Sequence, residues 1–166
     1  MSRVVGPSLS PALVDRFSQR DLGRRLGVAL PVVTVDRDGR PHPMLISYLE
    51  LRAYDTRTVG WVIQATSGSA RNLVERQVAT LIVVEPDTIV YVKLRTVDGP
   101  LPVTGVHDLG LGYFLLEVEQ VIEDSAADWE AGMRVTTPAR YAPVPTLEEP
   151  WAKITLAALE TPRARA

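Results

Sequence analysis

Strand patterns dominate the order of apolar and polar positions along the 166-residue chain. Short apolar runs, rich in β-branched residues, recur between polar turns, which is typical of closely spaced antiparallel strands. Six strands are predicted, at residues 31–35, 44–51, 59–64, 78–84, 89–97 and 113–122. The run 78–84 is apolar on both faces, which indicates a central strand. The run 113–122 alternates, so we expect it to bury Phe114, Leu116 and Val118 and to expose Glu117 and Glu119.

Helical periodicity is limited to short segments. Ser10-Pro11 predicts a helix start, followed by an imperfect apolar stripe that includes Leu13 and Phe17. Further helices are predicted from about residue 68 to 76, from 124 to 132 and from 148 to 159, with a short strand at 133–137. Residues 1–9 are expected to form a loose arm and residues 98–112 a loop. This order of elements excludes repeated βαβ units.

The predicted fold class is therefore mainly β: a six-stranded antiparallel barrel with a few short peripheral helices. The length fits one domain with a substantial core. Within this single domain, residues 1–25 form an N-terminal arm and helix, residues 26–123 the barrel and residues 124–166 a C-terminal helical extension.

Composition excludes several function classes. A net charge of −2 argues against a nucleic-acid partner or a membrane surface held by bulk electrostatics. There is no cysteine, and with only His42 and His107 no metal site is predicted. The N-terminus lacks the apolar core of a signal peptide, and no apolar run approaches the roughly 20 residues of a membrane span, so we expect a cytoplasmic protein.

The segment 65–73 carries the clearest candidate chemistry. Hydroxyl groups of Thr66, Ser67 and Ser69 lie at the predicted start of a helix, with Arg71 in its first turn. Unpaired N–H groups and a partial positive charge at a helix start favour a phosphate, and a guanidinium can hold two of its oxygens. The simpler interpretation is that Ser67 or Ser69 caps the helix and Arg71 is solvated.

The order of several segments resembles the FMN-binding split β-barrel proteins, the pyridoxamine 5′-phosphate oxidase-like group. The matching stretches are Val33-Thr34-Val35-Asp36, Asp38-Gly39-Arg40-Pro41-His42, Ser67-Gly68-Ser69-Ala70-Arg71-Asn72-Leu73 and Thr80-Leu81-Ile82-Val83-Val84. The resemblance covers roughly residues 26–98. It implies a split β-barrel and a homodimer with two FMN sites at the subunit interface.

In this family, hydroxyl and basic residues after the third strand hold the flavin phosphate, and the second strand lines the ring. The predicted cofactor-binding residues are Ser67, Ser69, Arg71, Asn72, Thr66, His42, Met44, Leu45, Ile46 and Ser47. Vitamin B6 oxidases carry a basic residue and a lysine near the positions of His42 and Ser47. The resemblance therefore implies an FMN-dependent oxidoreductase acting on a small molecule of unknown identity.

Alternatives remain open. The same barrel can host deazaflavin F420, whose longer anionic tail would need further basic groups such as Arg16, Arg20, Arg24 and Arg25. A non-catalytic flavin binder, a barrel whose site has decayed, or a haem protein with His42 or His107 as axial ligand are the others. No acid, base or nucleophile is identified; His107 with Asp108 is a candidate acid/base or gate, and Trp151 either packs or covers the partner's flavin.

Overall fold

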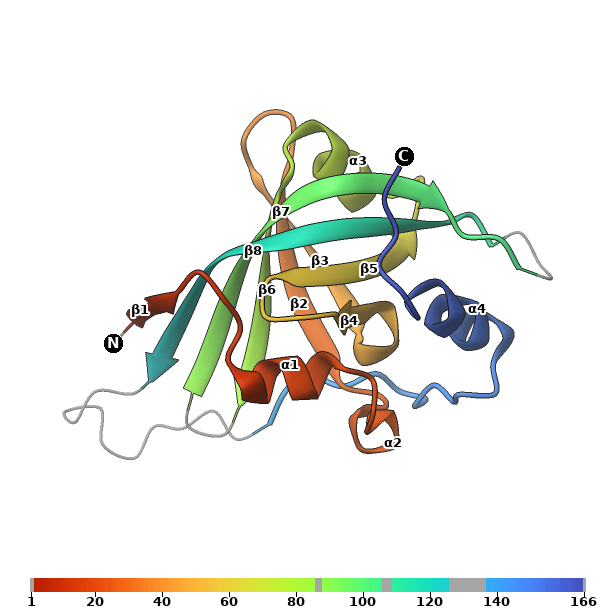
Figure 1. Ribbon diagram of the computed structural model, residues 1–166, viewed down its shortest axis with the longest axis horizontal. Helices are drawn as coiled ribbons and strands as arrows, with labels where there is room; N and C mark the ends of the chain where they lie inside the picture. Colours follow the sequence, from red (N-terminus) through yellow and green to blue (C-terminus); the bar gives the residue numbers. More distant parts are fainter. Residues whose placement is uncertain (1, 86–87, 106–108, 126–136, 166) are drawn as a thin grey trace.

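The fold is an antiparallel sheet curled into a half-barrel, with four short helices around it (Figure 1). The computed structural model describes residues 2–85, 88–105, 109–125 and 137–165. Its strands are β1 (Ser2–Gly6), β2 (Ala29–Val35), β3 (Pro41–Ser47), β4 (Leu51–Ala53), β5 (Thr58–Gln64), β6 (Val78–Glu85), β7 (Thr88–Pro102) and β8 (Leu111–Ser125). Their order in the sheet is β3-β2-β6-β7-β8-β5-β4, and β1 pairs with β8. The prediction of a mainly β antiparallel barrel is confirmed.

The number of strands differs from the predicted six. Residues 2–6 form β1, in register with the end of β8 from Ser2 opposite Asp124, so the loose arm predicted for residues 1–9 is wrong in this part. The predicted strand 44–51 is interrupted by a 3-10 turn at Tyr48–Glu50, and the chain then continues as β4. A capping box between Ser47 and Glu50 causes the interruption, because the carboxylate of Glu50 accepts both the backbone N–H and the hydroxyl of Ser47.

Two predicted loops and caps are strand instead. β7 and β8 continue through much of the region 98–112, which was predicted to be loop. Irregularities in their register, between Thr96 and Asp98 and between Asp98 and Leu101, accommodate the glycine and proline residues there. Asp124 and Ser125, predicted to cap a helix, close β8 opposite the start of β7. The rest of that predicted helix, and most of the strand predicted at 133–137, lie outside the described residues.

The helices are α1 (Pro11–Phe17), α2 (Leu22–Arg25), α3 (Gly68–Glu75) and α4 (Pro150–Ala158). Ser10 caps α1 through its side chain, as predicted. The first helix ends earlier than its apolar stripe suggests, since Gln19 adopts a positive φ of 66°. None of the described helices has the length and apolar character needed to cross a membrane.

One large core fills the half-barrel. It includes the side chains of Trp61, Phe17, Leu30, Leu81 and Phe114, all nearly inaccessible to solvent. The alternation predicted for residues 113–122 is confirmed, because Phe114, Leu116 and Val118 are buried. β3 is the last strand on its side of the sheet and carries Pro41 and Pro43. The tight turn joining β2 to β3, with Gly39 at a φ of 85°, lies beside α3 at the top of the view in Figure 1.

Candidate cofactor site

The candidate site begins where β5 ends and α3 starts. Ser67 is the N-cap of α3, and its hydroxyl oxygen accepts a hydrogen bond from the N–H of Ala70 at 3.1 Å. The capping role considered for Ser67 is therefore present. The N–H groups of Gly68 and Ser69 have no acceptor among the described residues. Two backbone donors thus remain available at the positive end of the helix dipole.

Ser69 adds a hydroxyl group to these donors. Its side chain is buried, with a relative exposure of 3% for the residue, and no described residue accepts or donates a hydrogen bond at its hydroxyl. Thr66 is exposed in the turn before α3. Arg71 is exposed as well, and its guanidinium has no ion-pair partner among the described residues. Both the hydroxyl of Ser69 and the charge of Arg71 are therefore available to a ligand.

His42, on β3, is brought to the same point by a hydrogen-bonded chain. Its Nδ1 donates to Oδ1 of Asp36 at 3.0 Å, across the turn that joins β2 to β3. The imidazole packs against Gly68, where an added Cβ would lie only 3.0 Å from Cε1 and 3.3 Å from Nε2 of His42. Glycine is needed at position 68 because any side chain would displace the imidazole from the helix start.

Asn72 connects α3 to the same turn. Its Nδ2 donates to Oγ1 of Thr34 at 3.0 Å and to Oδ1 of Asp36 at 2.9 Å. The residue is 3% exposed, and its amide hydrogens are used within the protein. The structure therefore shows Asn72 linking α3 to β2, while its predicted contact with a cofactor stays a prediction.

Asp36 is the shared acceptor of this cluster. The hydrogen bond from Asn72 is the largest factor that holds the pKa of Asp36 below its ordinary value of 3.8. Burial opposes this effect, and the hydrogen bond and charge of His42 and the charge of Arg71 support it. Asp36 is thus ionised at neutral pH and fixes which nitrogen of His42 faces the helix start.

The segment predicted to line a flavin ring runs along β3. Ile46 is buried in the core and Met44 packs partly against it, so these two side chains point into the barrel. Leu45 points the other way and is 53% exposed. Ser47 is buried and bonded to Glu50. Among the described strands β3 has only β2 as a neighbour, so its backbone, together with Leu45, is the part of this segment that a ligand can reach.

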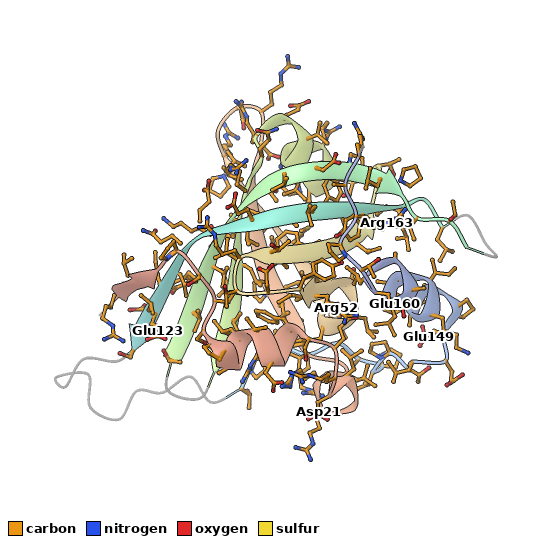
Figure 2. The ribbon with its side chains drawn as sticks, in the orientation of Figure 1. Asp21, Arg52, Glu123, Glu149, Glu160 and Arg163 are labelled. Atoms are coloured by element: carbon orange, nitrogen blue, oxygen red, sulfur yellow. The ribbon has the colours of Figure 1, made fainter. Side chains whose placement is uncertain are left out.

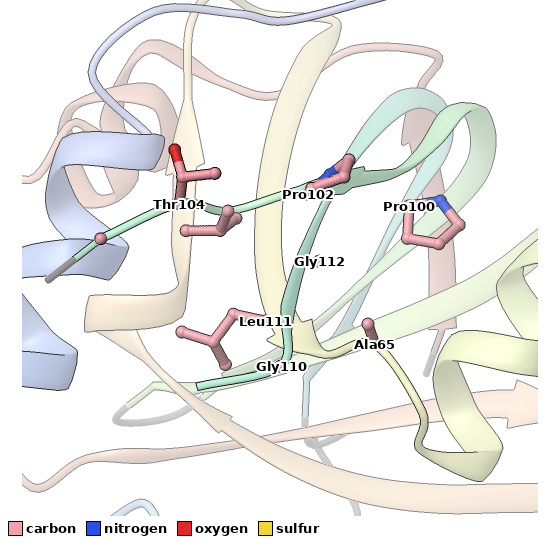
Figure 3. Close-up of a pocket in the computed structure, with 9 residues that line it drawn as sticks. Ala65, Pro100, Pro102, Thr104, Gly110, Leu111 and Gly112 are labelled. Carbon is pink, nitrogen blue, oxygen red and sulfur yellow. The ribbon is translucent and has the colours of Figure 1, made fainter. Parts of the chain in front are cut away.

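A cavity of about 470 Å³ lies next to the start of α3 (Figure 3). It is lined by the end of β7, the start of β8 and Ala65, which directly precedes Thr66. The N–H of Ala65 donates to the carbonyl of Gly110 at 2.8 Å and ties the turn before α3 to this wall. The sequence interpretation missed this cavity because it assigned residues 98–112 to a loop.

Other predicted residues lie elsewhere. Figure 1 places α1 and α2 at the opposite end of the molecule from α3, so Arg16, Arg20, Arg24 and Arg25 are far from the candidate site of the same chain. Trp151 packs partly against the core, and its indole donates to Glu149. His107 and Asp108 lie outside the described residues. The described residues contain no group of three or more His, Asp or Glu that could hold a metal ion.

Asp36 was missed as a functional residue. The sequence interpretation placed it in the turn after the strand ending Thr34-Val35, without a partner. A carboxylate opposite a histidine across a short turn was the available signal, because residues facing each other across such a turn lie close together. The buried partner Asn72 could not be found in this way, since it lies 36 positions further along the chain.

Comparison with known proteins gives a fold but no close relative. No protein-family model and no curated protein matches the chain. A candidate pyridoxamine 5′-phosphate oxidase from Lactobacillus delbrueckii is 14% identical, with a TM-score of 0.52 over 73% of this chain and 98% of that one. An FMN-binding protein from Syntrophomonas wolfei is 14% identical, with a TM-score of 0.50 over 70% and 89%.

A third structure is similar over more of the chain. PhzG from Burkholderia lata, in complex with tetrahydrophenazine-1-carboxylic acid, is 15% identical, with a TM-score of 0.50 over 81% of this chain and 94% of that one. Identities this low establish the fold and leave the ligand of this chain to be argued from its own residues. The chain therefore has the split β-barrel fold of the FMN-binding, pyridoxamine 5′-phosphate oxidase-like proteins, as its sequence suggested.

Proposed function

We propose that this protein binds FMN, with the phosphate at the start of α3, and acts as an FMN-dependent oxidoreductase on a small molecule. The observation that carries the proposal is the set of unused donors at one point. The N–H groups of Gly68 and Ser69 and the hydroxyl of Ser69 have no partner among the described residues, and Arg71 is exposed beside them. Such a set fits a phosphate dianion in number, charge and type.

The residues around this point have distinct roles in the proposal. Arg71 holds phosphate oxygens, and Ser69 with the two backbone N–H groups fixes their orientation. Asp36 keeps the Nδ1 of His42 engaged, so the Nε2 remains on the side of the helix start. The open edge of β3 and the exposed Leu45 would support one side of the ring. When bound, FMN supplies hydride exchange at its ring, and the chain supplies binding, orientation and exclusion of water.

FMN is preferred to the two other cofactors for specific reasons. The four N-terminal arginines suggested for the tail of F420 lie at the other end of the chain from α3 (Figure 1). A haem would need an axial ligand, but His42 is tied to Asp36 and packed against Gly68. Both remain outcomes of the test below.

The proposal includes a homodimer in the cytoplasm. The sheet face that turns away from the core carries apolar side chains on adjacent strands: Leu45 opposite Pro31, Ile82 opposite Tyr91 and Val84 opposite Ile89. These residues are partly or largely exposed in the single chain. A continuous apolar face of this kind is typical of a protein–protein interface. A second copy of the chain is the occupant that matches the position of the candidate site at its margin, beside the edge strand β3.

The test is FMN binding by the purified protein and its Arg71→Ala variant. We expect one FMN per chain, and an affinity roughly ten- to a hundred-fold lower in the variant, because charge-assisted hydrogen bonds contribute about 1.5–3 kcal/mol. Arg24→Ala is the matched control, since Arg24 is an exposed arginine of α2 at the other end of the molecule. Quenching of FMN fluorescence measures both affinities.

Two results would contradict the proposal. Equal affinities for Arg71→Ala and the wild type would place the phosphate elsewhere. A protein that ignores FMN while binding F420 or showing a strong Soret band would carry one of the other cofactors. The visible spectrum of the protein as purified gives the first indication.

A further inference from the structure

The cavity beside α3 has a lining without charge. Its described walls are Ala65, backbone and side chains of Pro100, Pro102, Val103 and Leu111, and glycines at both ends of the turn region (Figure 3). Thr104 supplies the sole polar side chain among the described lining residues, and it is exposed at the margin. A charged ligand would lose its hydration here without gaining a partner in these walls.

Glycine keeps this cavity open next to the turn before α3. An added Cβ at Gly112 would lie 2.8 Å from Cβ of Pro100 and 3.2 Å from Cβ of Ala65. Any side chain at position 112 would therefore fill the space between the wall and the turn. A volume of about 470 Å³ lies in the range of small-molecule sites, towards its lower end.

The C-terminal segment holds the wall of the cavity in place. The guanidinium of Arg163 donates to the carbonyl of Pro102 at 3.2 Å, and that of Arg165 donates to the carbonyl of Pro100 at 3.4 Å. Figure 2 shows Arg163 near the ends of β7 and β8, above α4. The N–H of Arg163 also donates to the hydroxyl of the buried Tyr113 at 3.2 Å. A wall fixed in this way costs little ordering when a ligand enters.

We propose that this cavity binds an uncharged, flat, apolar compound of about two fused rings, and that such compounds are the substrate class of the protein. The assignment as substrate rests on the proposed flavin function, since Ala65 joins the cavity to the turn that leads into the cofactor site. The binding itself does not depend on that function. An apolar ring gains by leaving water, and nothing charged in the described lining opposes it.

Menadione, an uncharged naphthoquinone, is the probe, and 1,4-naphthoquinone-2-sulfonate is its anionic counterpart. Calorimetry on the full chain, with and without saturating FMN, measures the affinity for each. We expect menadione to bind at least ten-fold more tightly than the sulfonate. Thr104→Trp and Ala65→Leu each fill the cavity and should weaken menadione at least ten-fold. Thr56→Trp, an exposed threonine at the other end of β5, is the control and should change nothing.

Each outcome decides one claim. Equal binding of the two quinones, or menadione binding that neither filling variant weakens, would overturn the inference. Mutual exclusion of menadione and FMN, with both weakened equally by Thr104→Trp, would show that the flavin ring occupies the cavity and would also overturn it. Menadione binding that depends on the cavity in a protein unable to bind FMN would support the site and refute the proposed flavin function alone.

Discussion

Replacement of Asn72 by alanine tests the connection between α3 and the β2–β3 turn. Asn72 is buried, and its amide donates to the hydroxyl of Thr34 and to the carboxylate of Asp36. The variant removes both donors at once without altering the backbone of the helix. It therefore separates a structural role of Asn72 from the cofactor contact that the sequence predicts for it.

The magnitude follows from burial at the two acceptors. The side chain of Asp36 is 41% exposed, so water can replace the lost amide there. Thr34 is fully buried and keeps one bond, from its hydroxyl to the carbonyl of His42 at 3.3 Å. Loss of a partner from a buried polar group costs roughly 1–3 kcal/mol. In a domain of this size the melting temperature should fall by roughly 2–12 °C, at about 2–4 °C per kcal/mol.

Urea unfolding and thermal melting of the free protein measure this loss. Glu75→Ala, an exposed position at the end of the same helix, is the control and should shift the free energy of unfolding by no more than about 0.5 kcal/mol. FMN affinity is measured in parallel on both variants.

The reasoning would be refuted by an Asn72→Ala variant as stable as the control. If that variant also lost FMN affinity, Asn72 would be a cofactor contact and its bonds to Thr34 and Asp36 would contribute little. A large loss of stability with a small loss of affinity supports the structural role.

Two further predictions concern the pH dependence of stability and the oligomeric state. Burial raises the pKa of Glu50 above its ordinary value of 4.5, so the folded chain keeps this proton to higher pH than the unfolded chain. The wild type should therefore lose stability relative to Glu50→Gln as pH rises from about 4.5 through the raised pKa, and parallel urea curves across this range would contradict the assignment. Ile82→Asp places a charge on the apolar outer face and should convert a dimer to a monomer in analytical ultracentrifugation, whereas Leu147→Asp, exposed outside that face, should not. A wild-type protein that sediments as a monomer would rule out the homodimer.

Local patterns were sufficient to predict most of the sheet. The alternation in 113–122 and the apolar run 78–84 identify β8 and β6, because burial on one or both faces of a strand leaves a direct mark on residue order. The start of α3 was predicted from Ser67 for the same reason, since capping involves residues a few positions apart.

Features that depend on distant partners were not predictable. β1 is a strand because its backbone pairs with β8, more than a hundred positions away, while its own side chains are mostly exposed. Residues 98–102 contain glycine and proline, which suggest a loop, yet pairing with β8 extends β7 through them. The cluster of Asp36, His42 and Asn72 likewise depends on how α3 packs on the β2–β3 turn.

The two prolines of β3 limit how copies of this protein can associate. Pro41 and Pro43 stand on the terminal strand of the sheet and lack the N–H that a further strand would need for a hydrogen-bonded ladder. Sheet extension from one molecule to the next is therefore blocked at this margin. Growth into fibrils through this edge is disfavoured, although the strand remains accessible to a small ligand.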